Sequence, residues 1–399
     1  MAGARILLFT GKGGVGKTTL AAATAARLAV GGRKVLVASA DPAHSLGDVF
    51  GRGLTTEPSE VDTCLYAAHV DARGLVDKAW QDIRRQLRTA LAGAGLDELD
   101  AAELTVLPGV DELLALTEVA RLAREGPWEV VVVDCGPTAE TLRLLALPEA
   151  VAGYVDRLHR AAPSLGTLAA HLADLRRLLV DPAVTSVRLV LTPERLVVAE
   201  TRRTLAALAL RGIRVDSLVA NRLLPRARPK TRLRGRASIP KTRLRGRASI
   251  PWRGPAASWL RIRRAEQDAV LSELDASTPL RVHLVEHRPA EPVGTRPLLE
   301  LAEELYGDAD PLAEPFAGGG DVRPLLGIRT TAEGGYELTV ALPLTDSSEL
   351  DLARVGDDLA ITVDGARRLV ALPVLLRRHT VTDAAVEDGG LVLRFEERA

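Results

Sequence analysis

The chain has 399 residues, of which 47% are hydrophobic and 26% are charged, proportions that exclude a collagen-like, coiled-coil or wholly disordered protein. Its 52 Lys and Arg residues balance its 52 Asp and Glu residues, and the length favours two or three domains of roughly 150 residues each. Since no apolar run approaches the ~18 residues of a membrane span and the N-terminal apolar stretch is short for a signal peptide, we expect a cytoplasmic protein.

A glycine-rich loop follows the first predicted strand. Residues 5–10 form an apolar run typical of a buried strand, and an Ala- and Leu-rich helix is expected to end near Val30. In a loop of the pattern GxxxxGKT, backbone N–H groups at a helix N-terminus close around phosphate oxygens. The setting predicts a nucleotide site in which Lys17 reaches the β- and γ-phosphates and the Thr18 hydroxyl ligates Mg²⁺. The loop residues are Gly11, Lys12, Gly13, Gly14, Val15, Gly16, Lys17, Thr18 and Thr19.

The lysine directly after the first loop glycine is unusual. The chain has 46 Arg but only six Lys, and the loop contains two of these six. With Lys12 the loop resembles the deviant Walker A class of dimeric P-loop ATPases. That resemblance implies that Lys12 reaches the nucleotide of a partner subunit, and the alternative is a lysine that merely faces solvent.

Two carboxylates are predicted at the ends of further strands. A strand over 34–38 leads to the sequence DPAHSLGDVF at 41–50, and the apolar strand over 130–133 ends at Asp134. Open α/β sheets bind ligands at the carboxyl ends of their strands. We therefore expect a mostly parallel sheet flanked by helices, with Asp134 holding Mg²⁺ directly or through water. Asp48 is the candidate to orient the attacking water, and its alternative role is a helix N-cap.

Two leucine-rich stretches have helical spacing, and each predicts a helix with one apolar face. Such a face either packs inside the protein or its dimer, or forms a surface that is exposed in one nucleotide state. The residues of these faces are Leu75, Val76, Trp80, Ile83, Leu87 and Leu91 in the first stretch and Leu165, Leu168, Leu172, Leu175 and Leu179 in the second.

The segment 222–264 contains fifteen basic residues and no acidic one. Within it the unit KTRLRGRASIP occurs at 230–240 and again at 241–251. An exposed insertion is the simplest interpretation, and contact with nucleic acid or anionic lipid is the alternative. No aromatic residue lies within the two units, which argues against single-strand binding.

The C-terminal part differs in character from the rest of the chain. A stretch rich in Gly, Pro and Asp at 307–324 predicts a linker. Beyond it, alternating apolar residues predict about seven short strands, which form an all-β sandwich over 325–399. The frame LTVALP, DDLAIT and EDGGLVLRF resembles the small heat-shock, or α-crystallin, domain. The clearest predicted strands are 336–342, 358–363, 368–372 and 391–395.

Five motifs occur in the order found in the ArsA/GET family of ATPases, which the chain resembles over most of residues 1–306. The resemblance implies a P-loop ATPase domain over 1–306, a homodimer, and ATP with Mg²⁺ at or near the dimer interface. It also implies that Asp48 in the first switch loop positions water, that DCGPT forms the second switch loop, and that Asn221 contacts the adenine base. The motifs are GKGGVGKTT at 11–19, DPAHSLGDVF at 41–50, PGVDE at 108–112, DCGPTAETLRLLALP at 134–148 and LVANR at 218–222.

The chain also departs from its apparent relatives. Metalloid binding needs three soft thiolates, whereas this chain has only Cys64 and Cys135. The CxxC zinc motif of the tail-anchored-protein targeting branch is missing after Asn221, so no zinc is expected. Met1 is the only methionine, so a Met-rich client groove is missing as well. In the second switch loop, Ala139 and Glu140 replace the Gly-His of the family.

From these features we expect a Mg²⁺-dependent ATPase that acts as a nucleotide-switched homodimer and binds or targets hydrophobic protein clients. One alternative is a spatial regulator of the ParA/MinD kind, which would use the basic segment on nucleic acid or lipid. Another is the ATPase subunit of a metalloid pump.

Overall fold

The computed structural model describes residues 3–41, 45–70, 110–146, 166–226, 254–276, 278, 280–313, 326–331, 335–340, 350–387 and 390–397. The predicted helix over 75–91, the two basic repeat units and part of the linker lie outside these ranges. No helix in the described ranges is both long enough and apolar enough to cross a membrane.

The N-terminal part is built on an eight-stranded sheet with the order β3-β4-β2-β5-β1-β6-β7-β8. All neighbouring strands are parallel except β3 and β4. The central strands are almost entirely buried because helices cover both faces of the sheet. The strands are β1 (Arg5–Gly11), β2 (Val35–Ser39), β3 (Ser59–Asp62), β4 (Leu65–His69), β5 (Val130–Pro137), β6 (Thr185–Leu191), β7 (Val215–Leu223) and β8 (Val282–Glu286).

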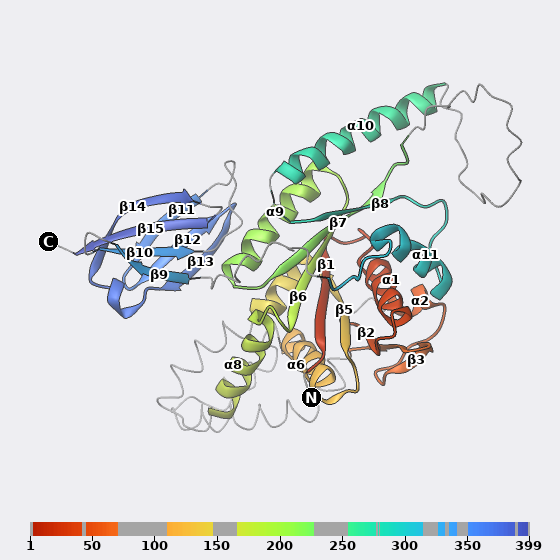
Figure 1. Cartoon of the computed structure of the whole chain (residues 1–399), viewed down its shortest axis with the longest axis horizontal. Coiled ribbons are helices and arrows are strands. Elements are labelled where there is room, and N and C mark those ends of the chain that lie inside the picture. Colours follow the sequence, from red (N-terminus) through yellow and green to blue (C-terminus); the bar gives the residue numbers. More distant parts are fainter. Residues whose placement is uncertain are drawn as a thin grey trace, which may run out of the picture.

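Two groups of helices flank this sheet, and Figure 1 shows α1, α2 and α11 on one side and α6, α8 and α9 on the other. The long helix α10 extends along the edge near β8 and contacts α9. The chain therefore has the predicted architecture of a mostly parallel sheet between helical layers. The helices are α1 (Lys17–Val30), α2 (Ser45–Phe50), α6 (Val110–Glu125), α8 (Gly166–Val180), α9 (Arg195–Leu210), α10 (Pro255–Ala276) and α11 (Thr295–Tyr306).

The leucine stripe of α8 faces the protein interior along its described part. Leu172, Leu175 and Leu179 are each at most 3% exposed, and Leu175 and Leu179 pack into the core of the large sheet. This favours intramolecular packing for the second of the two predicted apolar faces.

The C-terminal part is an antiparallel β-sandwich, as the alternating pattern predicts. One sheet has the order β14-β15-β10-β9 and the other β11-β12-β13, and their apolar faces form one common core. Ala206 and Leu210 of α9 belong to the same core, so the sandwich packs against the large domain. The elements are β9 (Leu326–Thr330), β10 (Tyr336–Val340), β11 (Leu350–Val355), β12 (Asp358–Val363), β13 (Ala366–Ala371), a 3₁₀ turn (Val374–Leu376), β14 (His379–Glu387) and β15 (Gly390–Glu397).

The first residues of the predicted linker, 307–313, are held against the large domain. Asp310 pairs with Arg33 at 2.5 Å, and the Pro311 carbonyl accepts a hydrogen bond from Arg188 at 3.0 Å. Residues 307–313 therefore belong to the large domain, although the composition places them in the linker.

Candidate nucleotide site

The predicted phosphate loop lies between β1 and α1, where Gly11 and Gly16 leave no room for a side chain. Gly11 has φ +154°, and a Cβ there would lie 2.0 Å from the Val190 carbonyl oxygen. Gly16, the residue before α1, has φ +98°, and a Cβ there would lie 2.4 Å from Nδ2 of Asn221. A side chain at Gly11 would therefore collide with the backbone of β6, and one at Gly16 would displace the Asn221 side chain. Gly13 and Gly14 are exposed, and Gly14 also has a positive φ of +76°.

Asn221, near the end of β7, contacts this loop directly. Its Nδ2 donates a hydrogen bond to the Val15 carbonyl at 2.8 Å, and its Oδ1 accepts one from the Arg222 amide at 2.8 Å. The side chain is thus fixed at both ends, and it fixes the loop backbone in turn. The contact of Asn221 with adenine stays a prediction, whereas its contact with the loop is an additional role that the motif did not indicate.

The two loop lysines have different environments. Lys17 is only 6% exposed, and its Nζ donates to the Lys12 carbonyl at 3.4 Å. The side chain of Lys12 is exposed. An ammonium group held inside the loop suits phosphate neutralisation, whereas an exposed one is free to reach a nucleotide on another subunit.

Asp134 lies on β5, next to β1, and its carboxylate is fully buried beneath the loop. Its Oδ2 accepts a hydrogen bond from the Ser39 hydroxyl at 3.2 Å, whereas its Oδ1 is buried and has no hydrogen-bond partner. Burial raises the pKa of Asp134 to about 6, against the opposing effects of the Thr18 hydroxyl and the Lys17 charge.

This arrangement fits a magnesium ion. A buried carboxylate oxygen without a partner is costly unless a cation satisfies it. The Thr18 hydroxyl beside it completes a pair of hard oxygen ligands of the kind that Mg²⁺ prefers. Thr18 is positioned in turn by the Ser45 hydroxyl of α2 at 3.1 Å. The structure therefore brings together the two predicted metal ligands.

Ser39 is a site residue that the motifs did not single out. Its hydroxyl donates to Asp134 and accepts a long hydrogen bond from the Asp41 amide at 3.4 Å, so it joins the Asp134 carboxylate to the start of the predicted first switch loop. The available signal was a serine at the carboxyl end of a predicted strand. Residues 42–44 of that loop lie outside the described residues.

Asp48 lies in the first turn of α2, and its side chain is exposed. Since α2 begins at Ser45, Asp48 is inside the helix, a position that does not match the N-cap alternative. The Ser45 contact to Thr18 places this helix beside the phosphate loop. Thr19 follows Thr18 in the first turn of α1.

A chain of buried hydroxyls connects the phosphate loop to the second switch loop. Thr10, the last residue before Gly11, donates to the Thr141 hydroxyl at 2.9 Å. Thr141 donates onward to the Gly136 carbonyl at 3.0 Å, and both threonines are at most 2% exposed. Thr141 therefore fixes the distance between the two segments that face the phosphates.

Replacing Thr141 tests this link. Thr141→Val keeps the shape but leaves the Thr10 hydroxyl and the Gly136 carbonyl without their partner, so we expect kcat to fall by about 10-fold because the switch loop is misplaced. KM for ATP should change less, because the loop amides that bind phosphate remain. Thr141→Ser keeps the hydroxyl and should restore kcat. Steady-state ATPase kinetics of the wild type and the two variants measure this. A kcat of Thr141→Val equal to that of the wild type would contradict the role of Thr141.

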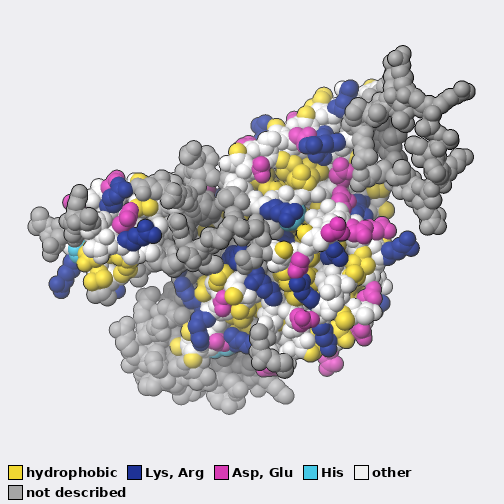
Figure 2. Space-filling model, in the orientation of Figure 1, with side chains coloured by type: hydrophobic (Ala, Val, Ile, Leu, Met, Phe, Trp, Pro, Cys, Tyr) yellow, Lys and Arg dark blue, Asp and Glu magenta, His cyan; other side chains and the backbone are white. Residues whose placement is uncertain are grey.

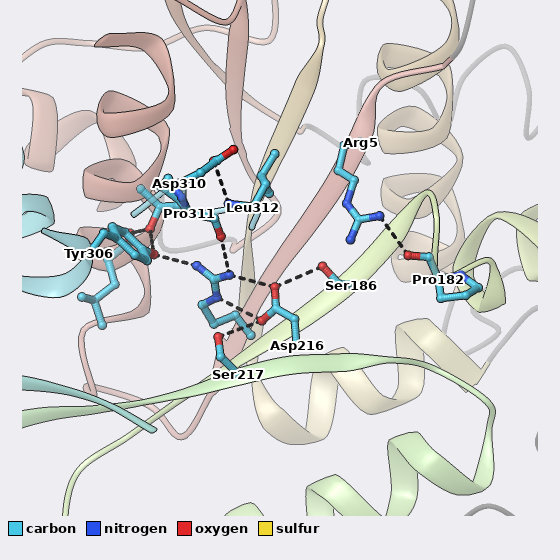
Figure 3. A network of polar contacts seen from close by, with 12 residues as sticks. Arg5, Pro182, Ser186, Asp216, Ser217, Tyr306, Asp310, Pro311 and Leu312 are labelled. Carbon is cyan, nitrogen blue, oxygen red and sulfur yellow. Dashed lines mark hydrogen bonds and ion pairs between the residues drawn. The ribbon is translucent and has the colours of Figure 1, made fainter. Parts of the chain in front are cut away.

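A buried polar network supports the helix that follows the loop (Figure 3). Arg188 of β6 binds Asp216 of β7 through two parallel contacts, Nε to Oδ1 at 3.0 Å and Nη2 to Oδ2 at 2.8 Å. Its Nη1 donates to the Tyr306 hydroxyl of α11 at 2.6 Å, and this hydroxyl lies 2.7 Å from the Thr24 hydroxyl of α1. The network thus joins α1 to two strands and to α11.

His283 of β8 packs edge-on against the Tyr306 ring in this region and donates from Nδ1 to the Leu305 carbonyl at 3.2 Å. Burial lowers the pKa of His283 from 6.5 to about 4, and the charges of Arg188 and Arg281 act in the same direction. Asp216 opposes this shift. His283 is therefore neutral in the folded protein at neutral pH.

This shift makes stability depend on pH. Between pH 6.5 and about 4 the unfolded chain binds a proton at His283 that the folded chain does not, so the free energy of unfolding should decrease with falling pH, by up to about 3 kcal/mol. Asp134, whose pKa is raised to about 6, acts in the opposite direction. The test therefore compares how steeply the free energy of unfolding falls with pH in the wild-type protein and in His283→Gln. Urea unfolding at pH 7, 6 and 5 gives these slopes, and His283→Gln should lack the contribution of His283. An unchanged slope would contradict the assignment.

Two sequence-family models match the chain. The model of the anion-transporting ATPases, ArsA, matches residues 4–175 and 158–246, which include the phosphate loop, Asp134 and Asn221. The model of an HSP20-like domain found in ArsA matches residues 333–395, which lie within the sandwich.

The chain is similar to individual proteins, two of which match nearly its whole length. The chain is 38% identical to Protein Rv2184c of Mycobacterium tuberculosis, over 98% of this chain and 96% of that protein. It is 30% identical, over the same shares of the two chains, to a Chlorobaculum tepidum protein provisionally named an arsenical pump-driving ATPase. A homologue of the ATPase ASNA1 from Babesia bovis is 32% identical over 54% of this chain and 65% of its own length.

Proposed function

The chain belongs to the anion-transporting ATPase family, and we propose that it hydrolyses ATP with Mg²⁺ as a nucleotide-switched homodimer that binds hydrophobic protein clients. The observation that carries the catalytic part is the buried carboxylate of Asp134, which has one oxygen without a partner beside the phosphate loop. A site of this kind is costly to maintain in a folded protein unless a cation occupies it.

Each part of the site has a role in phosphoryl transfer. The loop amides from Gly13 onward bind the phosphates, and Lys17 neutralises charge on the β- and γ-phosphates. Thr18 and Asp134 would hold Mg²⁺, which neutralises the charge that develops on the phosphate oxygens. Asp48 orients the attacking water, and Ser39 holds the Asp134 carboxylate in place. Phosphoryl transfer needs mainly this positioning and charge neutralisation.

The homodimer part of the proposal depends on Lys12. Its side chain is exposed, whereas Lys17 in the same loop is buried, so Lys12 is available to a nucleotide bound by a second copy. Equilibrium sedimentation with and without ATP and Mg²⁺ tests this, and we expect dimer formation to weaken in Lys12→Ala. If the wild type and Lys12→Ala form equally stable dimers with ATP and Mg²⁺, Lys12 does not contact the nucleotide of the partner subunit.

The client part is supported by apolar surface outside the core. Trp259 and Ile262 on α10 are each 62% exposed, and they lie three residues apart on one side of this helix. The charged side chains of the described surface are mixed in sign, as Figure 2 shows, with no broad field of one sign on that face. Exposed apolar side chains of this kind support contact with a hydrophobic partner.

Metalloid-driven activity is the second candidate, because full-length relatives carry the arsenical pump name. The structure weighs against a thiolate site within one chain. The Cys64 carbonyl bonds to the Val35 amide at the start of β2, whereas Cys135 follows Asp134, which pairs with Ser39 at the end of β2. The two cysteines therefore lie near opposite ends of the strand β2, and burial raises the pKa of the Cys135 thiol.

One experiment separates these candidates. Asp48→Asn protein with ATP and Mg²⁺ is crosslinked in a cell lysate, and the bound material is identified by mass spectrometry against an ADP control. Hydrophobic polypeptides enriched with ATP support the proposal, and nucleic acid recovered alone would overturn its client part. ATPase activity that arsenite stimulates, and that is lost in Cys64→Ser, would favour the metalloid candidate.

A further inference from the structure

Helix α9 lies between the large sheet and the β-sandwich (Figure 1). One of its faces lines a small cavity next to the phosphate loop. Val197, Thr201 and Thr204, which are three or four residues apart, line this cavity together with Gly11 and Lys12. This face of α9 and the first residues of the loop therefore lie around the same cavity.

The opposite face of α9 belongs to the sandwich. Two residues advance an α-helix by about 200°, so Ala206 points away from the side that carries Thr204. Ala206 is 3% exposed and Leu210 is 1% exposed, and both are part of the sandwich core with residues such as Leu359 of β12 and Val370 of β13. Because Val198, Leu205 and Leu208 of α9 pack in the core of the large sheet, this helix buries apolar residues against both the large sheet and the sandwich.

The same cavity also reaches the second switch loop. Thr138, which follows β5, lines it together with Glu200 of α9. Lys12 and Glu200, which carry opposite charges, thus lie on the walls of one cavity. Residues of the phosphate loop and of the second switch loop therefore line one cavity with α9, and α9 packs against the sandwich through Ala206 and Leu210.

We propose that the β-sandwich is a regulatory domain of the ATPase and that α9 transmits the nucleotide state of the phosphate loop to it. This inference rests on the proposed nucleotide binding. When Lys12 and Thr138 move to accommodate nucleotide, α9 shifts as a rigid element, because packed cores transmit displacement rather than absorb it. The sandwich interface then repacks at Ala206 and Leu210. By reciprocity, the docking of the sandwich alters nucleotide affinity.

Hydrogen exchange of the full chain tests the proposal, with apo protein compared with protein bound to ADP or to ATP and Mg²⁺. Nucleotide should change the exchange of α9, β12 and β13 as well as that of the loop. Ala206→Arg inserts a guanidinium into the interface and should abolish the change in β12 and β13 while altering nucleotide affinity about 5-fold or more. Leu196 of α9 is 79% exposed, so Leu196→Arg places the same group in solvent. This control should leave the exchange of β12 and β13 and the nucleotide affinity as in the wild type.

Glu200→Gln provides a second variant in case Ala206→Arg unfolds the sandwich. It keeps the shape of α9, removes the charge that faces the loop, and should reduce the nucleotide-dependent change in β12. Protection of the loop in wild-type protein without any change in β12 and β13 would overturn the coupling and leave nucleotide binding intact. Absence of protection at the loop itself would instead overturn the proposed function and the coupling with it.

Discussion

Asp48→Asn is expected to lower kcat for ATP hydrolysis by about 100-fold or more, because the amide cannot accept the proton of the attacking water. Nucleotide affinity should stay within about 2-fold, since the phosphate contacts come from the loop and from Lys17. Phosphate release under saturating ATP, together with ATP binding by calorimetry, measures the two effects separately.

A matched carboxylate provides the control for Asp48→Asn. Asp308→Asn makes the same change at an exposed position in the turn after α11 and should hydrolyse ATP at the wild-type rate. If Asp48→Asn also retains the wild-type rate, another group orients the water. If it loses ATP binding instead, Asp48 contributes to the ground-state site rather than to the chemical step.

Asp216→Asn is expected to lower the free energy of unfolding by about 3–5 kcal/mol. The side chains of Arg188 and Asp216 are only 4% and 8% exposed, so the substitution leaves a buried guanidinium without its counter-charge. Because Arg188 also holds Tyr306, which contacts Thr24 on α1, the loss should propagate to the helix behind the phosphate loop. Urea unfolding monitored by circular dichroism gives the value.

The chain contains a natural control for this effect. Asp310 pairs with Arg33, and these side chains are 40% and 34% exposed. Asp310→Asn removes an ion pair in solvent and should therefore cost at most about 1 kcal/mol. Similar losses for the two Asp→Asn variants would show that burial does not set the strength of the Arg188 pair, and the network would lose its assigned importance.

The sequence predicted the parts of the site that follow from strand and loop patterns. The strand over 5–10 and the helix ending at Val30 are confirmed because they depend on local spacing. The strand that carries Asp134 was also predicted, but it continues to Pro137 instead of ending at Asp134. The alternation in the tail predicted a sandwich for the same reason. In these segments local preference and tertiary packing favour the same structure.

The remaining features join residues that are distant along the chain. Thr10 and Thr141 meet because β1 and β5 are neighbours in the sheet, and no local pattern encodes that order. In the sequence Arg188 interrupts the apolar residues of a strand, yet in the structure it is the centre of the network in Figure 3. The two opposite faces of α9 are likewise visible only once the sandwich is placed.

The most direct test of the account is phosphate release from ATP by the full-length chain with and without Mg²⁺. We expect release that requires Mg²⁺ and falls to background in Asp134→Asn, which removes the buried carboxylate but leaves the loop and Lys17 in place. A folded protein that neither binds nor hydrolyses ATP in the presence of Mg²⁺, or an Asp134→Asn variant that hydrolyses at the wild-type rate, would contradict it.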